Sequence, residues 1–306
     1  MNTLILKLGA TGDVVRTTPL LLTRFRDDVS WITADKNLPL LKNLRQNLRC
    51  VSWENREIVC DKKYDLVINL EDTLDVAQFL KTIRFKNLFG AYANANDELL
   101  YTDDSRGWFD LSLISRFGRN NADKLKFQNR RTYQELIFHG LGFPFLDEPY
   151  FLPKPTKTDL SGDVAISPAA GPVWPMKNWT YYDDLKSELE REGLTVNVLP
   201  KRATLLEHLG DVRNHRVLVG GDSLPMHFAL GVGVRCVTVF TCTSPWEIHD
   251  YGLQRKIISP LLEQFFYQRG FDERATTAIS VEEVFEATLE QLQSPVEMAH
   301  EQLQKF

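Results

Sequence analysis

The sequence predicts an α/β protein made of two doubly wound, Rossmann-like domains with parallel sheets that face each other across a cleft. Short apolar runs alternate with helical patterns in the first half, which is typical of βαβ units. The same alternation restarts after a proline-bearing stretch, residues 148–162. A chain of 306 residues is long enough for each half to bury its own core. We expect the first domain to end near residue 153.

In the first half, strands are expected where apolar and β-branched residues run together, and helices where the apolar period lengthens. The expected strands span residues 3–7, 29–33, 49–52 and 66–70, and the expected helices span 19–26, 39–47 and 132–139. Gly140 and Gly142 would end the last of these helices. Residues 90–129 are less regular, and we expect an insertion with substrate loops there.

In the second half, the expected strands span residues 164–167, 195–199, 217–219 and 235–240. Thr180, with Asp183 three residues later, predicts the start of a helix that Gly193 closes. Ser280 and Glu283 form a second capping-box pattern, which predicts a final helix to about residue 293.

The composition excludes several classes of protein. No apolar run reaches the length of about 18 residues that spans a membrane, and the first residues lack a signal-peptide pattern. The four cysteines have no zinc-site spacing, so we expect no metal and a reducing, cytoplasmic location. The net charge of −5 and the lack of a binding motif argue against nucleic acid.

The first half nevertheless contains a cluster of basic residues. Its members are Lys81, Arg84, Lys86, Arg116, Arg119, Lys124, Lys126, Arg130 and Arg131. A solvated face is the simpler interpretation. The alternative is a docking surface for an anionic acceptor or for the anionic inner face of a membrane, which the protein would contact peripherally.

The loop after the first strand has the strongest functional pattern. Gly9, Thr11 and Gly12 shape it, and both glycines permit a positive φ and a close approach to the backbone. Asp13 would point into the crevice at the carboxyl end of the strand, where open α/β sheets bind ligands. The spacing is neither the dinucleotide pattern nor a Walker loop, so neither a nicotinamide nor an ATP site is indicated. Asp13 as a helix N-cap is the alternative, and Thr18 with Pro19 offers a competing helix start.

Three further loops follow strands of the second half. Ala170, Gly171 and Lys177 lie in the first loop, where a lysine before a helix start suggests a bound anion or an exposed, snorkelling side chain. The second loop leads into a helix whose N-terminal turn is suited to bind an anion. Simple capping of the helix and a packed histidine are the alternative explanation of the same residues. The residues concerned are Gly221, Asp222, Ser223, Leu224 and His227. The third loop contains Thr243 and would line the same cleft.

Together these loops resemble glycosyltransferase family 9, the ADP-heptose:lipopolysaccharide heptosyltransferases and their relatives. The family's Gly-Asp-Val and Thr-x-Pro segments match residues 12–14 and 17–20, and its Lys-x-Trp matches residues 177–179. Its Asp-Ser-Gly-Pro-x-His and Phe-Gly-x-Thr-x-Pro segments match residues 222–227 and 240–245. Leu224 stands where the family usually has glycine and Thr241 where it often does, and both lie in donor-facing loops, so the resemblance does not by itself fix heptose as the donor sugar.

The resemblance implies a GT-B fold with an acceptor domain at residues 1–153, a nucleotide-sugar domain at 154–280, and a C-terminal helix and tail, 281–306, that cross back to the first domain. It implies inverting transfer of a heptose or related sugar from a nucleotide diphosphate sugar, favouring an ADP-sugar, without a cofactor. The acceptor would be a lipopolysaccharide core or another glycan, lipid-linked or small molecule. Asp13 would be the base, and Lys177 with residues 222–227 and Thr243 would bind the donor. An inactive nucleotide-sugar-binding scaffold and a sugar-nucleotide epimerase are the alternatives.

Overall fold

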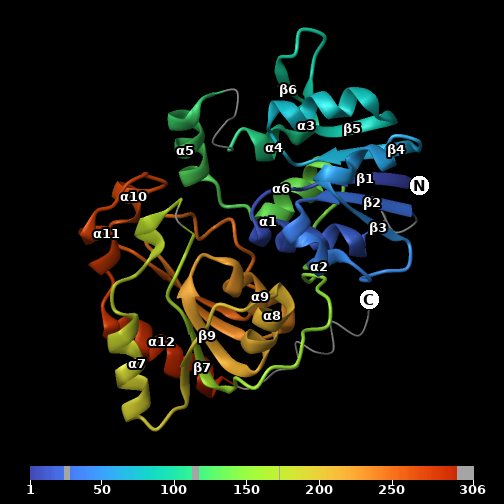
Figure 1. Cartoon of the computed structure of the whole chain (residues 1–306). Coiled ribbons are helices and arrows are strands. Elements are labelled where there is room, and N and C mark those ends of the chain that lie inside the picture. Colours follow the sequence, from blue (N-terminus) through green and yellow to red (C-terminus); the bar gives the residue numbers. More distant parts are fainter. Residues whose placement is uncertain (24–27, 112–116, 172, 295–306) are drawn as a thin grey trace. The chain divides into compact units, whose positions relative to one another are not determined.

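The computed structural model describes residues 1–23, 28–111, 117–171 and 173–294. The chain divides into two compact units, residues 1–153 and 154–306, and each is an α/β structure around its own sheet (Figure 1). Within the described residues, no helix is both long enough and apolar enough to cross a membrane.

The sheet of the first unit is parallel except at one edge. Its strands are β1 (Asn2–Leu6), β2 (Asp28–Thr33), β3 (Leu48–Ser52), β4 (Lys63–Asn69), β5 (Arg84–Ala93) and β6 (Leu99–Tyr101). Their order is β3-β2-β1-β4-β5-β6, and only β6 pairs antiparallel, with β5. The register aligns Leu6 with Asn69 and Asn69 with Gly90, so the carboxyl ends of β1, β4 and β5 lie at one edge.

Helices cover both faces of this sheet. On one face lie α1 (Thr11–Thr17), α2 (Leu38–Leu41) and α6 (Tyr133–Gly140), which bury Val14, Leu41 and Ile137 against strand residues such as Trp31. On the other face lies α3 (Leu74–Phe79), which buries Val76 and Phe79. Two further helices, α4 (Arg106–Phe109) and α5 (Arg119–Gln128), follow β6 in the chain.

Three expectations for this unit need correction. The helix expected over residues 39–47 ends at Leu41, because Lys42 is extended and Asn43 has a φ of +64°. The helix expected over 19–26 is a 3₁₀ segment, η1 (Thr18–Leu22), where it is described, and residues 24–26 lie outside the described residues. The segment 90–129 is not an irregular insertion, since it contains the end of β5 together with β6, α4 and α5.

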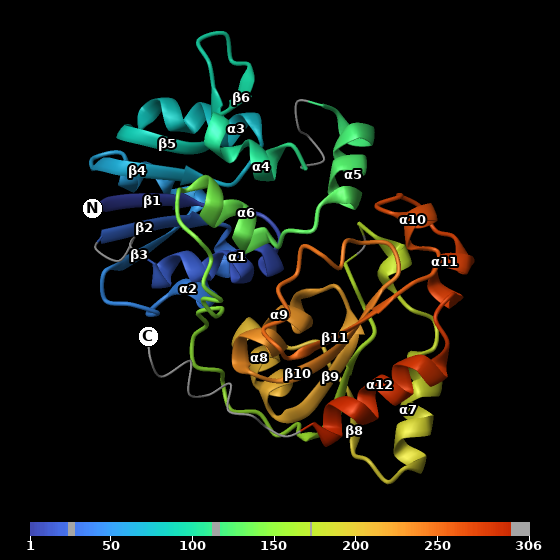
Figure 2. The same ribbon diagram turned by 180° about the vertical axis from the view of Figure 1, so that it is seen from behind.

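The sheet of the second unit is parallel throughout the described residues. Its strands are β7 (Gly162–Ser167), β8 (Val196–Val198), β9 (His215–Gly221), β10 (Arg235–Phe240) and β11 (Gln254–Ile258). Figure 2 shows them from the side on which β10 and β11 are visible. Their order is β11-β10-β9-β7-β8.

One face of this sheet is covered by α7 (Tyr182–Arg191) and α12 (Val281–Gln293), and the other by α8 (Leu205–Arg213) and α9 (Leu224–Val232) (Figures 1 and 2). The smaller α10 (Leu262–Phe265) and α11 (Glu273–Thr277) precede α12. The predicted Ser280 cap of α12 is confirmed, because its hydroxyl accepts a 3.2 Å hydrogen bond from the Glu283 N–H. The return of the tail to the first domain stays a prediction, since residues 295–306 lie outside the described residues.

The predicted Thr180 cap is wrong. Helix α7 begins at Tyr182, after Tyr181 in the N-cap position. The Thr180 hydroxyl instead lies 3.0 Å from the hydroxyl of Thr276, and its N–H donates to the Thr276 carbonyl. Thr180 therefore ties the start of α7 to α11, a contact between residues 96 positions apart.

Each sheet contains one point at which the chain reverses the direction of strand addition. In the first sheet it lies between β1 and β4, because β1 continues to β2 on one side and β4 to β5 on the other. In the second sheet it lies between β7 and β9 for the same reason. Open α/β sheets bind ligands beyond the carboxyl ends of the strands at such points. The loops after these four strands are thus the places to look for a site.

Candidate active site

At the switch point of the first sheet, ion pairs connect the loop after β1 with the loop after β4. The Lys7 ammonium lies 3.0 Å from Glu71 Oε1 and 3.7 Å from Asp13 Oδ2. Glu71 Oε1 also accepts hydrogen bonds from the N–H groups of Leu8 and Gly9, at 2.7 and 2.8 Å. Glu71 therefore fixes the backbone that leads into the Asp13 loop.

Asp13 is the accessible member of this cluster. It is the third residue of α1, whose N-cap position is held by Ala10, so the N-cap interpretation of Asp13 is wrong. Its side chain is 32% exposed, against 9% for Lys7 and 10% for Arg16. A ligand of the first unit can therefore reach the carboxylate of Asp13, whereas the two cations beside it are mostly covered.

Arg16 holds the other oxygen of this carboxylate. Its Nη2 lies 3.0 Å from Asp13 Oδ1, and its guanidinium lies 4.2 Å from the centre of the Tyr133 ring and 5.5 Å from that of Trp108. The Tyr133 hydroxyl is 2.7 Å from that of Thr17, and burial raises the pKa of Tyr133. Stacking on two rings orients the guanidinium, and thereby the carboxylate that it pairs with.

Lys7 is positively charged throughout the physiological pH range. Burial alone would lower its pKa, but the carboxylates of Asp13 and Glu71 outweigh burial and raise it. A buried ammonium is stable only when it is paired, so these two carboxylates hold Lys7 in its place. The cluster thus places the carboxylate of Asp13 beside the switch point of the first sheet.

The glycines of this loop act differently from the prediction. Neither Gly9 nor Gly12 has a positive φ. A Cβ at Gly9 would lie 2.9 Å from Lys7 Nζ and 3.2 Å from Glu71 Oε1, so a larger residue there would displace the ends of these two side chains. Gly12 is the second residue of α1, and the Thr11 hydroxyl donates to Asn37 Oδ1 at 2.8 Å. These contacts fix the loop from which Asp13 projects.

At the switch point of the second sheet, the loop after β7 meets the loop after β9. Lys177 Nζ lies 3.0 Å from Asp222 Oδ2 and 2.9 Å from the Asp222 carbonyl oxygen. The two side chains are 16% and 15% exposed. An ammonium has three N–H groups, so this pairing leaves one of them for a ligand.

Asp222 stays ionised far into the acid range. Burial alone would raise its pKa, but the charges of Lys177 and His227, with the nearby Thr243 hydroxyl, lower it to about 2. His227 and Thr243 are themselves buried. Three of the residues singled out in the sequence therefore surround the fourth, Asp222.

The first residues of α9 complete this group. Ser223 holds the N-cap position, but among the described residues its hydroxyl makes no capping bond and has no hydrogen-bond partner. Leu224, the first helical residue, is partly exposed and lies outside the buried core. The N-terminal turn of α9 is consequently not closed by its own side chains, and such a turn favours an anion.

The expected position of Lys177 at a helix start is wrong. Lys177 ends a 3₁₀ segment, η6 (Pro175–Lys177), and α7 starts only at Tyr182. Its charge is offset by Asp222 and not by a required anion. Gly221 allows this pairing, because a Cβ there would lie 3.0 Å from the Lys177 carbonyl oxygen.

The remaining loop residues support the Lys177 segment to different degrees. The Thr241 hydroxyl donates to the carbonyl of Met176, which anchors the segment to the end of β10. The Ala170 N–H donates to Asn178 Oδ1 at 2.7 Å. A Cβ at Gly171 would meet open space, so no contact among the described residues requires glycine there.

The basic cluster of the first unit does not form one exposed cationic surface. Lys81 and Lys86 pair with Asp97 and Asp65, and Lys126 is buried, with its ammonium 5.9 Å from the centre of the Trp108 ring. Arg116 and the side chain of Arg119 lie outside the described residues. The solvated-face interpretation fits the part that the structure describes.

Sequence reasoning missed Lys7, Arg16 and Glu71. A position-based signal existed for two of them, since Lys7 ends the first apolar run and Glu71 follows the fourth, both at carboxyl ends of parallel strands. Arg16 carries no such signal, because its role depends on Tyr133 and Trp108. Among the residues that the structure describes, no group of three or more His, Cys, Asp or Glu side chains could hold a metal ion.

Comparison with known proteins identifies the class. Residues 164–268, which contain the whole Lys177–Asp222 region, match the model of glycosyltransferase family 9 (heptosyltransferase). No curated protein sequence matches the chain. The Escherichia coli heptosyltransferase WaaC, solved with ADP, has a TM-score of 0.64 at 15% identity, covering 95% of this chain and 100% of its own.

Two further solved structures cover the chain equally well. The E. coli ADP-heptose lps heptosyltransferase II has a TM-score of 0.65 at 15% identity, covering 95% of this chain and 98% of its own. The glycosyl transferase family 9 protein of Veillonella parvula DSM 2008 has a TM-score of 0.66 at 15% identity, with 95% and 97% covered. The fold is therefore that of the GT-B heptosyltransferases, and the protein is a glycosyltransferase. Residues 164–268 of the second unit match the family 9 model, so the resemblance seen in the sequence is confirmed there.

Proposed function

We propose that this protein is an inverting, metal-independent glycosyltransferase that moves a heptose or related sugar from a nucleotide diphosphate sugar to an acceptor hydroxyl. The buried Lys177–Asp222 pair carries the proposal, because it lies at a switch point within the region that matches the family model. A cation and an open helix start at the carboxyl edge of a parallel sheet are suited to a diphosphate.

The second unit would bind the donor. Lys177 keeps one N–H for a phosphate oxygen, and the first turn of α9 adds the positive end of its dipole. Asp222, Ser223 and His227 would face the sugar or the diphosphate, beside Thr243. The E. coli relative WaaC was solved with ADP and with an ADP-2-deoxy-2-fluoro heptose, which supports an ADP-sugar as the donor.

Asp13 of the first unit would be the general base. Its carboxylate is accessible and stays between two cations, Lys7 and Arg16. As the acceptor oxygen forms its bond to the anomeric carbon, Asp13 takes the hydroxyl proton and the bond from that carbon to the phosphate oxygen breaks. One displacement inverts the configuration. The electron pair leaves on the nucleoside diphosphate, which Lys177 and α9 stabilise.

Metal independence follows in this proposal from the same charges. Lys177 and the N-terminus of α9 supply the positive charge that a divalent cation gives to a leaving diphosphate elsewhere. The related dodecameric TibC of enterotoxigenic E. coli is described as an iron-containing glycosyltransferase. Transfer by the present protein should continue in excess EDTA, and its loss there would refute this part of the proposal.

The acceptor in this proposal is a glycan, with the lipopolysaccharide core as first choice because of the named relatives. Lipid-linked and small-molecule acceptors belong to the same proposal. A cytoplasmic reaction at the inner face of the membrane is the matching location.

Binding and transfer test the proposal together. Melting curves with ADP, UDP, GDP and their sugars should show stabilisation by the preferred nucleotide, because binding to the folded state raises the melting temperature. Mass spectrometry with a glycan panel should detect the added sugar, and NMR its inverted anomeric configuration. Binding without any transfer would favour the scaffold alternative, and a donor returned with altered stereochemistry would favour the epimerase.

A further inference from the structure

A pocket of about 460 Å³ lies in the first unit, beside the outer edge of its sheet. Its wall is formed by α3 and the 3₁₀ turn after it, by β5 and β6, and by the start of α4. This volume is within the range of about 300–1,000 Å³ that small-molecule sites occupy. Lys81 of the basic cluster lines it, but none of the residues assigned to the base or to the donor site does.

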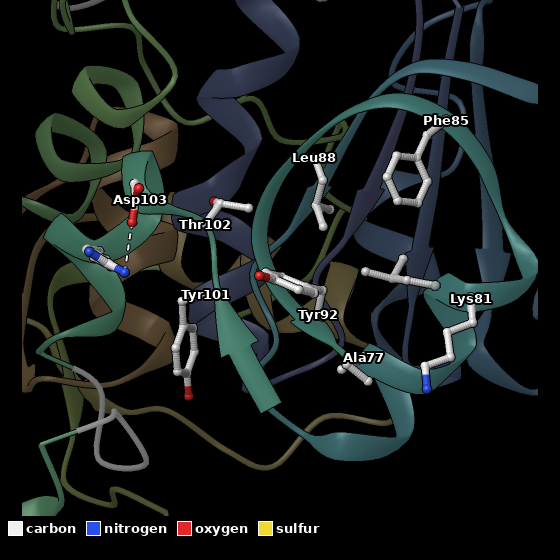
Figure 3. Close-up of a pocket in the computed structure, with 11 residues that line it drawn as sticks. Ala77, Lys81, Phe85, Leu88, Tyr92, Tyr101, Thr102 and Asp103 are labelled. Carbon is white, nitrogen blue, oxygen red and sulfur yellow. Dashed lines mark ion pairs between the residues drawn. The ribbon is translucent and has the colours of Figure 1, made fainter. Parts of the chain in front are cut away.

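Large side chains that the fold leaves partly exposed converge here. Phe85, Leu88, Tyr92 and Tyr101 all line the pocket and all keep some exposed surface. Figure 3 shows Tyr92 in the middle, with Leu88 and Phe85 toward one end and Thr102 and Asp103 toward the other. Aromatic rings that are left partly uncovered around one cavity are typical of a binding site.

The polar groups of the pocket are neutral or already paired. Lys81 lies 2.6 Å from Asp97, and Arg106 lies 2.7 Å from Asp103, the ion pair drawn in Figure 3. The Tyr92 hydroxyl has no hydrogen-bond partner among the described residues. Burial, with Asp72 and Asp110, raises the pKa of Tyr101 to about 12, so its hydroxyl stays protonated. The pocket therefore offers rings and hydroxyls without uncompensated positive charge.

The pocket is connected to the proposed base through the sheet. Gly90 of β5 is aligned with Asn69 of β4, and Asn69 with Leu6 of β1. Tyr92, two residues after Gly90, therefore lies at the carboxyl edge of the sheet. Glu71 and the Asp13 loop lie at the same edge, after β4 and β1. Two strand spacings separate β5 from β1, about 10 Å. The pocket lies on the face that α3 covers and α1 lies on the other face, so reaching both places takes an acceptor with several sugar rings.

We infer that this aromatic pocket is an acceptor subsite for a neutral sugar ring, which it holds while a hydroxyl of another ring meets Asp13. This inference rests on the proposed function and adds the class of acceptor to it. The CH face of a sugar packs on Tyr92 and Phe85, and its hydroxyls bond to Tyr92, Thr102 and Tyr101. Phosphate and carboxylate groups are not selected, because Lys81 and Arg106 are neutralised by their partners.

Binding of small glycosides tests the subsite without a donor. Methyl and p-nitrophenyl glycosides of neutral hexoses and heptoses, a matched glucuronide, octyl glucoside and inorganic phosphate would be titrated against isotope-labelled protein by NMR. Neutral glycosides should shift resonances of the pocket residues. Tyr92→Ala should weaken their binding about 3- to 10-fold. Tyr92→Phe, which keeps the ring, should lose less and should melt like the wild type.

A charge variant separates neutral from anionic ligands. Asp97→Asn frees the ammonium of Lys81 at the rim, and Asp65→Asn frees Lys86 of a similar exposed pair that does not line the pocket. For a neutral ligand the two variants should bind alike. Tighter binding of glucuronide or phosphate than of neutral glycosides at these residues in the wild type would overturn the inference, whereas a gain in anion binding only in Asp97→Asn is what a neutralised Lys81 predicts. An affinity that depends on the octyl chain alone would also overturn it.

Failure of the subsite and failure of the proposed function give different results. If no glycoside binds while ADP still stabilises the protein and transfer still occurs, only the subsite is refuted. If glycosides bind but no nucleotide does, the pocket stands and the glycosyl transfer is refuted.

Discussion

The Asp13 carboxylate and the Arg16 guanidinium lie one turn apart on α1, with Asp13 Oδ1 3.0 Å from Arg16 Nη2. Lys7 approaches the second oxygen of the same carboxylate, at 3.7 Å. The proposed base is thus oriented by two cations, of which one stacks on aromatic rings and the other is fixed by Glu71. This arrangement leads to the first two predictions.

Asp13→Asn should lower the rate of sugar transfer about 10²–10⁴-fold, the usual scale for one acid–base group. Donor binding should stay near the wild-type value, because Lys177 and Asp222 belong to the second unit. The measurements are steady-state transfer kinetics and nucleotide titration. Asp75→Asn, an acidic residue in the first turn of α3, is the matched control and should retain activity. Equal loss of folding and activity would show that Asp13 is only structural.

Arg16→Gln should lower kcat about 10-fold while changing the KM for the donor little. The substitution removes the partner that orients Asp13 and leaves Tyr133 without its cation, which costs about 1–2 kcal/mol of stability. Arg191→Gln breaks an exposed pair with the same spacing in α7 and is the control. A kcat equal to that of wild type would show that Arg16 has no positioning role.

Lys177→Met should weaken binding of the nucleoside diphosphate much more than binding of the bare nucleoside, because only the former has charge to pair. The variant also leaves Asp222 without its cation, so the double variant Lys177→Met with Asp222→Asn separates binding from folding. Calorimetric titration with ADP and adenosine gives both affinities. Equal losses for the two ligands would remove Lys177 from the diphosphate site.

Acid should destabilise the second unit through Asp222. Its pKa is about 2 in the folded protein and 3.8 in the unfolded reference, so the unfolded chain binds the proton first as the pH falls. The contribution, about 2 kcal/mol, is complete above pH 4 and disappears as the pH falls toward 2. Urea unfolding at several pH values should show this loss in wild type. In Asp222→Asn the acid loss should be smaller by this contribution, since Asp163 and Asp272 also have lowered pKa values, and an unchanged pH dependence would contradict the assignment.

Leu224→Gly should broaden the range of accepted donor sugars. Leu224 is partly exposed at the start of α9, so the substitution removes a side chain beside Asp222 without opening the core. The stability cost should be close to the helix penalty of glycine, about 1 kcal/mol. Transfer from several nucleotide sugars, with a melting curve for each protein, measures both effects. An ADP-heptose preference already present in wild type would contradict the specificity argument.

The sequence by itself determined the two parallel-sheet units and the loops that carry Asp13, Lys177 and Asp222. Local signals were sufficient there, because strands such as β10 (Arg235–Phe240) are rich in apolar and β-branched residues and the start of α12 is a local cap at Ser280. Once the strands are placed, their carboxyl ends indicate which loops meet a ligand. Those residues can therefore be read from spacing.

The tertiary structure decided how the charges are paired. Glu71 meets Lys7 across the switch point of the first sheet, Arg16 depends on Tyr133 of α6, and Lys177 pairs with Asp222, 45 residues away. Thr180, which has the local pattern of a cap, bonds to Thr276 instead. A sequence pattern reports local preference, whereas the partner of a buried charge or hydroxyl is set by strand order and helix packing, which bring distant residues within a few ångströms.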